Sequence, residues 1–335
     1  ADRRRGDIST HAPRQRLSRQ RVHRPLCACH AGRVRNRADP VFLLGAPRSG
    51  TTLLYRCLAL HPGAAWISNY QRRFPRGWPV AVLNRATRHT PAWTYAAWFG
   101  PEGDAAYRYS AARSAAERWW PQPVEGEPLF ATHGLPPAWD SGSVPARAAD
   151  LRVLIDRTTA AAGGRVFLSK RIAHNRRIPL LHALWPDARF LVLTRDGRAV
   201  SDSLVRVDWW PRTELWWWRA GAQPADWVAD GRDALEAAAR HWLAESDAIE
   251  EGLRGIPPDH VSRMAYEDLV ATPRPALAEA ARFARLDPRA GAWQRACAAI
   301  DFADRNSAWG DALDPSRMAA LALLTPRLEE LGYRT

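Results

Sequence analysis

The segment that follows residue 44 has the clearest chemical signal in this chain of 335 residues. It reads Gly45-x4-Gly50-Thr51-Thr52, after a short apolar run and before apolar positions at helical spacing. A strand, a glycine loop and a helix in this order point free backbone N–H groups at an anion, and the helix dipole adds about half a positive charge. The two threonine hydroxyls and the cation Arg48 add to this attraction. The pattern predicts a cradle for one phosphate group.

The same motif departs from the nucleotide-triphosphate loop G-x-x-x-x-G-K-[ST] at one position. Thr51 replaces the lysine that reaches the β- and γ-phosphates. ATP hydrolysis is therefore a poor hypothesis. A nucleotide whose 5′-phosphate carries something other than a phosphate chain fits better. The alternative without a binding role is a glycine turn ahead of a buried helix.

Three more polar residues follow strands that we predict from apolar runs. Lys170, the only lysine of the chain, ends a strand over 166–169, and Arg195 ends the run 189–194. Ser203 lies eight positions after Arg195. Parallel strands bring their carboxyl ends to one edge of a sheet, where ligands bind. A guanidinium and a hydroxyl are suitable donors to a phosphate monoester. The alternatives are an arginine in a surface ion pair, a helical serine and a lysine in solvent.

These residues carry a resemblance to a known family. Gly45-Ala-Pro-Arg-Ser-Gly-Thr-Thr-Leu-Leu54 resembles the 5′-phosphosulfate loop of sulfotransferases that use 3′-phosphoadenosine 5′-phosphosulfate (PAPS). Arg195-x7-Ser203 resembles the family's 3′-phosphate pair, and its surroundings are most similar to tyrosylprotein sulfotransferases and their bacterial relatives. The resemblance covers about residues 41–60, 166–207 and 258–331.

The resemblance implies a role for each matched residue, with PAPS as cosubstrate and no metal required. It places Lys170 beside the acceptor and the bridging oxygen. Arg48, Lys170, the loop amides and the threonines would offset charge on the leaving oxygen. The implied nucleotide contacts are Arg48, Ser49, Gly50, Thr51 and Thr52 at the 5′ end, Arg195 and Ser203 at the 3′-phosphate, and Arg305 as a further 3′ contact.

The general base for the acceptor is not fixed by the resemblance. Tyrosylprotein-type members use a glutamate after the phosphate helix, but residues 41–101 contain none, and Ile172 stands where cytosolic members have a histidine. We expect His174, the histidine nearest to Lys170, to act as the base. Glu125 is the next candidate, followed by Glu127 and His133, and the alternative for His174 is a packing or capping role.

The elements that must position these residues are predicted from periodicity. The expected fold is α/β, a P-loop-type parallel sheet flanked by helices, with a helical and loop-rich insertion over 61–165 for the acceptor. The expected strands are 41–44, 64–68, 166–169, 189–194 and 261–266, and the expected helices are 51–60, 78–88, 104–120, 147–161, 178–185 and 224–253, with a proline-rich loop over 121–145. For the tryptophan-rich segment from Trp209 to Trp218, an acceptor platform and core packing are equally favoured.

Charge and cysteine content limit the remaining classes. The net charge is +13, but eleven arginines lie in residues 1–38, which we expect to be a disordered extension ahead of one domain over 39–335. A transit peptide or a nucleic-acid-binding arm is the alternative for that extension. Four cysteines are too few for a disulfide framework, and the lone Cys27-x-Cys29-His30 disfavours zinc. We expect a cytoplasmic protein without a membrane anchor.

The expected reaction is transfer of a sulfuryl group to a hydroxyl or amine of a small molecule, glycan or lipid. No specific nucleic-acid partner is expected, and the sequence does not predict an oligomeric state. Two other classes stay open: a P-loop kinase or NTPase in which another cation replaces the missing lysine, and a polyanion-binding protein that acts through the arginine-rich extension.

Overall fold

The computed structural model describes residues 39–99, 119–138, 144–306, 309 and 314–334. The predicted extension 1–38, with the Cys27-x-Cys29-His30 segment, and nearly all of the predicted helix 104–120 lie outside these residues. Within the described part of the chain, no helix is long and apolar enough to cross a membrane.

The described chain is built on a five-stranded, all-parallel sheet with the strand order β2-β3-β1-β4-β5. The strands are β1 (Asp39–Leu44), β2 (Ala64–Trp66), β3 (Val166–Lys170), β4 (Arg189–Thr194) and β5 (Val261–Ala265). Leu43 pairs with Lys170, and Leu44 pairs with Val192. Because of this register, the residues that follow β1, β3 and β4 lie at one edge of the sheet. The predicted α/β fold with a parallel sheet is confirmed.

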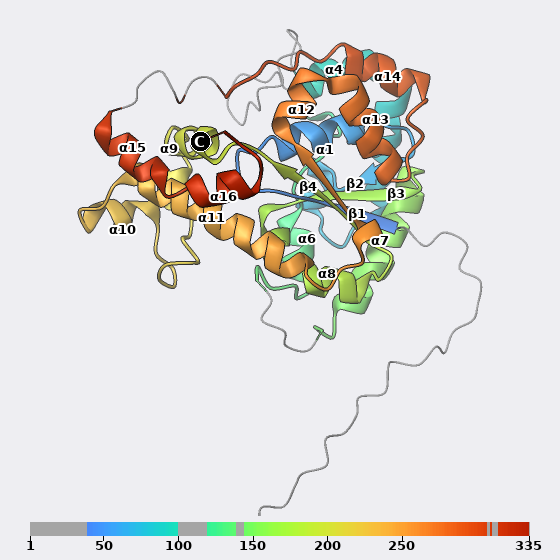
Figure 1. Ribbon diagram of the computed structural model, residues 1–335. Coiled ribbons are helices and arrows are strands. Elements are labelled where there is room, and N and C mark those ends of the chain that lie inside the picture. Colours follow the sequence, from blue (N-terminus) through green and yellow to red (C-terminus); the bar gives the residue numbers. More distant parts are fainter. Residues whose placement is uncertain (1–38, 100–118, 139–143, 307–308, 310–313, 335) are drawn as a thin grey trace, which may run out of the picture. The chain divides into compact units, whose positions relative to one another are not determined.

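Helices cover both faces of the sheet, and alternate strand residues contact each layer (Figure 1). The odd-numbered β1 residues face α1 (Thr51–Ala59), α4 (Pro91–Phe99), α13 (Pro273–Phe283) and α14 (Gly291–Ala298). Phe42 and Leu44 face α6 (Glu127–Thr132), α7 (Ala148–Ala162), α8 (Ile178–Leu184) and the end of α11 (Ala234–Leu253). Burial on both faces explains why the strands read as apolar runs instead of alternating patterns.

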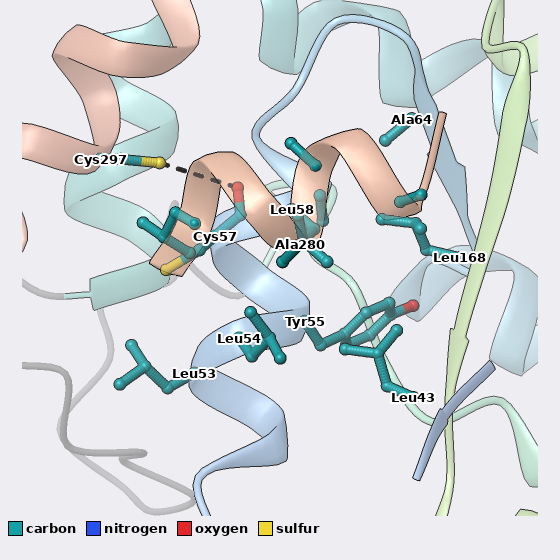
Figure 2. Packing of buried hydrophobic residues seen from close by; sticks show 14 of the residues in the cluster. Leu43, Leu53, Leu54, Tyr55, Cys57, Leu58, Ala64, Leu168, Ala280 and Cys297 are labelled. Carbon is teal, nitrogen blue, oxygen red and sulfur yellow. Dashed lines mark hydrogen bonds between the residues drawn. The ribbon is translucent and has the colours of Figure 1, made fainter. Parts of the chain in front are cut away.

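Figure 2 shows the core on the α1 side of the sheet. Leu43 and Leu168 of the sheet, Leu54 of α1 and Ala280 of α13 belong to one cluster of buried side chains. The cysteines of α1 and α14 also lie in this layer, both buried and free. Each large aliphatic side chain buried in this way contributes about 1.5–3 kcal/mol.

A third cluster of buried side chains joins helices that continue past the carboxyl edge of the sheet. Trp242 of α11 packs there with α9 (Gly197–Val205), α10 (Pro224–Ala229), α15 (Pro315–Ala322) and α16 (Thr325–Glu330). The predicted helix 224–253 is two helices, because Gly231 (φ 77°) breaks it and Asp233 accepts from the amide of Glu236 to begin α11.

The insertion has more regular structure than the sequence predicts. The predicted helix 78–88 is the 3₁₀ helix η1 (Trp78–Arg85) followed by α3 (Ala86–His89), and the predicted loop 121–145 contains α6. The remaining elements are α2 (Asn69–Arg73), η2 (Ile172–Arg176), η3 (Trp210–Arg212), η4 (Pro258–His260) and α12 (Tyr266–Ala271).

Gly164 provides a test of how closely β2 and β3 pack. A Cβ atom at this position would lie 2.8 Å from Cβ and 2.9 Å from the backbone nitrogen of the buried Ala65. We expect Gly164→Ala to lower the free energy of unfolding by about 1–3 kcal/mol. Gly255→Ala is the matched control, because a Cβ there would meet no atom within 4 Å. Urea unfolding compares the two, and an equal effect would contradict the close approach.

Candidate active site

The loop between β1 and α1 depends on its two glycines. Gly45 and Gly50 have φ angles of 152° and 85°, in the range that favours glycine. A Cβ on Gly45 would lie 2.5 Å from the carbonyl oxygen of Leu193, and one on Gly50 would lie 2.6 Å from the ring of Tyr266. No side chain caps α1 at Gly50, so the amides of its first turn have no intrahelical acceptor. The loop thus offers backbone donors at a helix start.

Ser49 lies inside this loop with its hydroxyl buried. The side chain is 1% exposed, and Oγ has no hydrogen-bond partner among the described residues. A buried polar group without a partner costs about 1–3 kcal/mol, so it needs an explanation. Ser49 lines a small cavity together with Trp242 and Ser246 of α11.

The end of β4 meets the same loop through Arg195. Its Nη1 donates to the carbonyl oxygen of Arg48 at 2.9 Å, and its guanidinium stacks 4.4 Å from the ring centre of Tyr266. Its Nη2 donates to the carbonyl oxygen of Arg305 at 2.7 Å, and its Nε donates to Asn306 Oδ1 at 2.8 Å. The structure therefore brings the predicted residue Arg305 to Arg195 through its backbone.

Arg48 and Ser203 bring the loop and α9 together. Nε of Arg48 donates to Oγ of Ser203 at 2.9 Å, although the two residues are 155 positions apart in sequence. The sequence analysis assigned these two donors to opposite ends of one nucleotide, and in the structure they contact each other directly.

The end of β3 carries a cluster of charged side chains. Nζ of the buried Lys170 lies 2.5 Å from Oε1 of Glu125, and Nη1 of Arg171 lies 2.6 Å from Oε2 of the same carboxylate. Burial would raise the pKa of Glu125, but the charges of Lys170 and Arg171 outweigh burial and hold the pKa below its ordinary value. The structure thus places a deprotonated carboxylate on the lysine.

His174 lies in the protein interior and not in this cluster. Arg177 Nε donates to His174 Nδ1 at 3.1 Å, so Nε2 carries the proton and donates to Ser169 Oγ at 2.8 Å. The ring packs edge-on against Phe42 and Phe130. Burial lowers its pKa well below the ordinary value. Both nitrogens are used inside the fold, as the packing alternative expects.

The two other candidates for the base also have partners in the protein. Glu127 accepts from Arg177 Nη2 at 2.9 Å and from Arg171 Nε at 3.2 Å. His133 lies at the end of α6, with Nδ1 2.8 Å from the carbonyl oxygen of Leu129. Among the described residues it is Glu125, and neither of these two side chains, that pairs with Lys170.

Asn175 and Glu245 hold the loop in place, and the sequence analysis missed both. The Asn175 side chain accepts from the amide of Gly45 at 3.2 Å and donates to the Gly45 carbonyl oxygen at 3.0 Å. Its Nδ2 also donates to Oε2 of the fully buried Glu245 at 2.7 Å. The signal for Glu245 was a carboxylate on the apolar stripe of α11, between Trp242 and Ile249. Asn175 has no comparable signal.

The tryptophan-rich segment packs mainly in the third cluster. Trp210 is buried, and Trp217 and Trp218 make edge-on contacts with the ring of Trp227. Trp216 Nε1 donates to Oε1 of Glu245 at 2.9 Å. These contacts favour the core-packing interpretation of the segment over a platform for an acceptor.

Comparisons with known proteins agree with this geometry. A sequence model described as the sulfotransferase family matches residues 40–289. No curated protein matches the chain. Sulfotransferase STF9 from Mycobacterium avium is similar in structure, with 14% sequence identity and a TM-score of 0.52 over 89% of this chain and 78% of that chain. The sulfotransferase domain of the Synechococcus PCC 7002 olefin synthase is 17% identical over 90% of this chain and 97% of that chain, with a TM-score of 0.48.

The structural likeness at this identity concerns the fold alone, whereas the family match spans well over half of the chain. The family match concerns the sulfotransferase family as a whole, so the closer resemblance to tyrosylprotein members stays a prediction. The predicted family is confirmed: the chain belongs to the sulfotransferase family, a class of PAPS-dependent transferases.

Proposed function

We propose that this chain transfers a sulfuryl group from PAPS to a hydroxyl or amine of a small molecule, glycan or lipid. The supporting observation is the contact between Arg48 and Ser203, at 2.9 Å, which joins the loop after β1 to the helix after β4. A nucleotide with a phosphate at each end of its ribose needs donors in two adjoining places. A kinase or NTPase would instead need a cation where Thr51 stands.

The residues at each end suit the phosphate group that we assign to them. At the 5′ end, the start of α1 has no side-chain cap, so the backbone amides of its first turn can donate to a phosphate. At the 3′ end, Arg195 is held by carbonyl oxygens of Arg48 and Arg305, so its guanidinium is oriented before a ligand arrives. Oriented donors lose less entropy on binding than free ones do.

We assign the proton transfer to Glu125 and the stabilisation of the leaving oxygen to Lys170. Bound PAPS would supply the sulfuryl group. The ion pair keeps Glu125 deprotonated, because the lysine and Arg171 lower its pKa. If Lys170 turns toward the leaving oxygen, Glu125 loses one neighbouring cation. Its pKa then rises and it becomes a better base for the acceptor proton.

Glu125 takes this role in preference to His174 because of position. The histidine is fully buried and bonded at both nitrogens, so it acts by fixing Ser169 and Arg177. Glu125 touches the lysine directly. A base must come within hydrogen-bond reach of the proton that it removes.

Arg195→Gln and Ser203→Ala test the 3′ end. We expect each variant to weaken the binding of 3′,5′-ADP, by about 10- to 100-fold for the arginine and about 3-fold for the serine. Binding of 5′-AMP, which lacks the 3′-phosphate, should change little in Ser203→Ala and less than that of 3′,5′-ADP in Arg195→Gln, which also loses the contact to the carbonyl of Arg48. Isothermal titration measures both, with Arg206→Gln as control, because that exposed side chain follows α9 and pairs with Asp202 of the helix. An equal loss for both nucleotides would refute the assignment.

Glu125→Gln tests the base. We expect kcat to fall by about 10²–10⁴-fold while the affinity for 3′,5′-ADP stays within about 3-fold of the wild type. Glu127→Gln is the matched control, since it removes a carboxylate of the same ion-pair network that does not contact Lys170. Acceptors are screened with radiolabelled PAPS. If the two variants retain equal activity, another group is the base.

Asn175→Ala tests whether Asn175 positions the loop. We expect it to weaken 3′,5′-ADP binding about 10-fold, because Gly45 loses two hydrogen bonds. Asn84→Ala removes another buried asparagine, which bonds to the carbonyl oxygen of Trp66 instead. Both variants should lose similar stability in urea unfolding, but only Asn175→Ala should lose nucleotide affinity. Unchanged affinity would restrict Asn175 to a role in folding.

A further inference from the structure

A basic cleft lies in the inserted part of the chain, and of the residues discussed above only His133 lines it. Its volume is about 450 Å³, within the usual range for a small-molecule site. Its lining comes from the segment that leads into η1, the end of α6 and α7. Helices α6 and α7 lie on the same side of the sheet (Figure 1).

Arginines dominate the charge of this cleft. Arg76, Arg147 and Arg157 line it against one carboxylate, Asp150, so three positive groups face one negative group and the net charge is +2 with histidine neutral. Within the described part of the chain, none of the ion pairs involves any of these four side chains. Elsewhere the structure pairs many of its arginines, for example Arg171, Arg177 and Arg317.

The cleft also contains two aromatic rings, those of Trp78 and His133. Trp78 lines it, and the guanidinium of Arg157 lies 5.8 Å from the centre of the Trp78 ring. His133 also lines the cleft and is mostly buried. Its Nδ1 donates to the carbonyl oxygen of Leu129, so Nε2 is the ring nitrogen that a ligand could reach. A flat aromatic face beside cations suits a ring that carries an acidic group.

One short helix, α6, separates His133 of the cleft from Glu125 along the chain. Glu125 lies two residues before α6, which spans residues 127–132, and His133 follows the helix. Six helical residues rise about 9 Å. A molecule the size of a glycoside is long enough to span this distance, with one group in the cleft and a reacting hydroxyl beside Glu125.

We propose that this cleft binds an anionic group of the acceptor, a carboxylate, sulfate or phosphate on a ring-containing molecule. The proposal rests on the sulfotransferase function proposed above, since it names the substrate class of that site. Asp150 limits the binding of a dense polyanion, because it adds a repulsive charge among the three arginines.

Three probes that differ at one carbon test the proposal: 4-nitrophenyl β-D-glucoside, the corresponding glucuronide and the 6-phosphate of the glucoside. Each is titrated into the full chain saturated with 3′,5′-ADP, which removes competition from the nucleotide site. We expect both charged probes to bind about tenfold more tightly than the neutral one, with each of Arg147→Gln and Arg157→Gln reducing that preference about threefold. Arg274→Gln, an exposed arginine of α13, should leave it unchanged.

The outcomes separate this proposal from the proposed function. If 3′,5′-ADP binds but the three probes bind alike, or if the preference survives both arginine replacements, the cleft is not an anion site and the sulfotransferase assignment stands. If 3′,5′-ADP itself does not bind, the proposed function fails and the cleft proposal fails with it. Unchanged 3′,5′-ADP affinity in Arg147→Gln and Arg157→Gln shows that these variants are folded.

Discussion

The backbone conformation of residues 45–50 depends on contacts with three segments that are distant in sequence. Asn175 binds the amide and the carbonyl of Gly45, the end of β4 lies against Gly45, and the ring of Tyr266 lies against Gly50. Arg48 itself has a φ angle of 69° and its carbonyl is held by Arg195. A non-glycine residue in this conformation persists only where its surroundings fix it. The loop is thereby shaped before an anion binds.

The same edge of the sheet concentrates positive charge, and the fold manages it with specific partners. Lys170 is held by Glu125, whereas Arg195 is held by neutral carbonyl oxygens and an aromatic ring. An arginine held by neutral groups keeps its full charge for a ligand. A lysine paired with a carboxylate exchanges that partner when a stronger anion arrives, and this exchange also changes the basicity of Glu125. In the proposed site, the nucleotide end is therefore fixed and the reacting end can exchange partners.

Much of the sheet could be predicted from the sequence, because buried parallel strands such as 189–194 are nearly continuous apolar runs. The glycine loop and the Arg195–Ser203 spacing could also be predicted, because both are short local patterns that follow strands. Glu125 was harder, since an isolated bridge between Ser68 and Pro123 brings it to Lys170 from 45 residues away. Proximity in sequence favoured His174, but the 3₁₀ helix after β3 turns that ring into the core. Long-range pairing of this kind leaves no periodic signal.

The central claim is that two phosphate-binding ends of the site share one nucleotide. The most direct measurement is the affinity of the wild-type chain for 3′,5′-ADP compared with its affinity for ATP, by isothermal titration. We predict that 3′,5′-ADP binds at least about 100-fold more tightly, because Arg195 and Ser203 meet its 3′-phosphate and no lysine at position 51 meets a γ-phosphate. Equal affinities, or a preference for ATP, would contradict the claim.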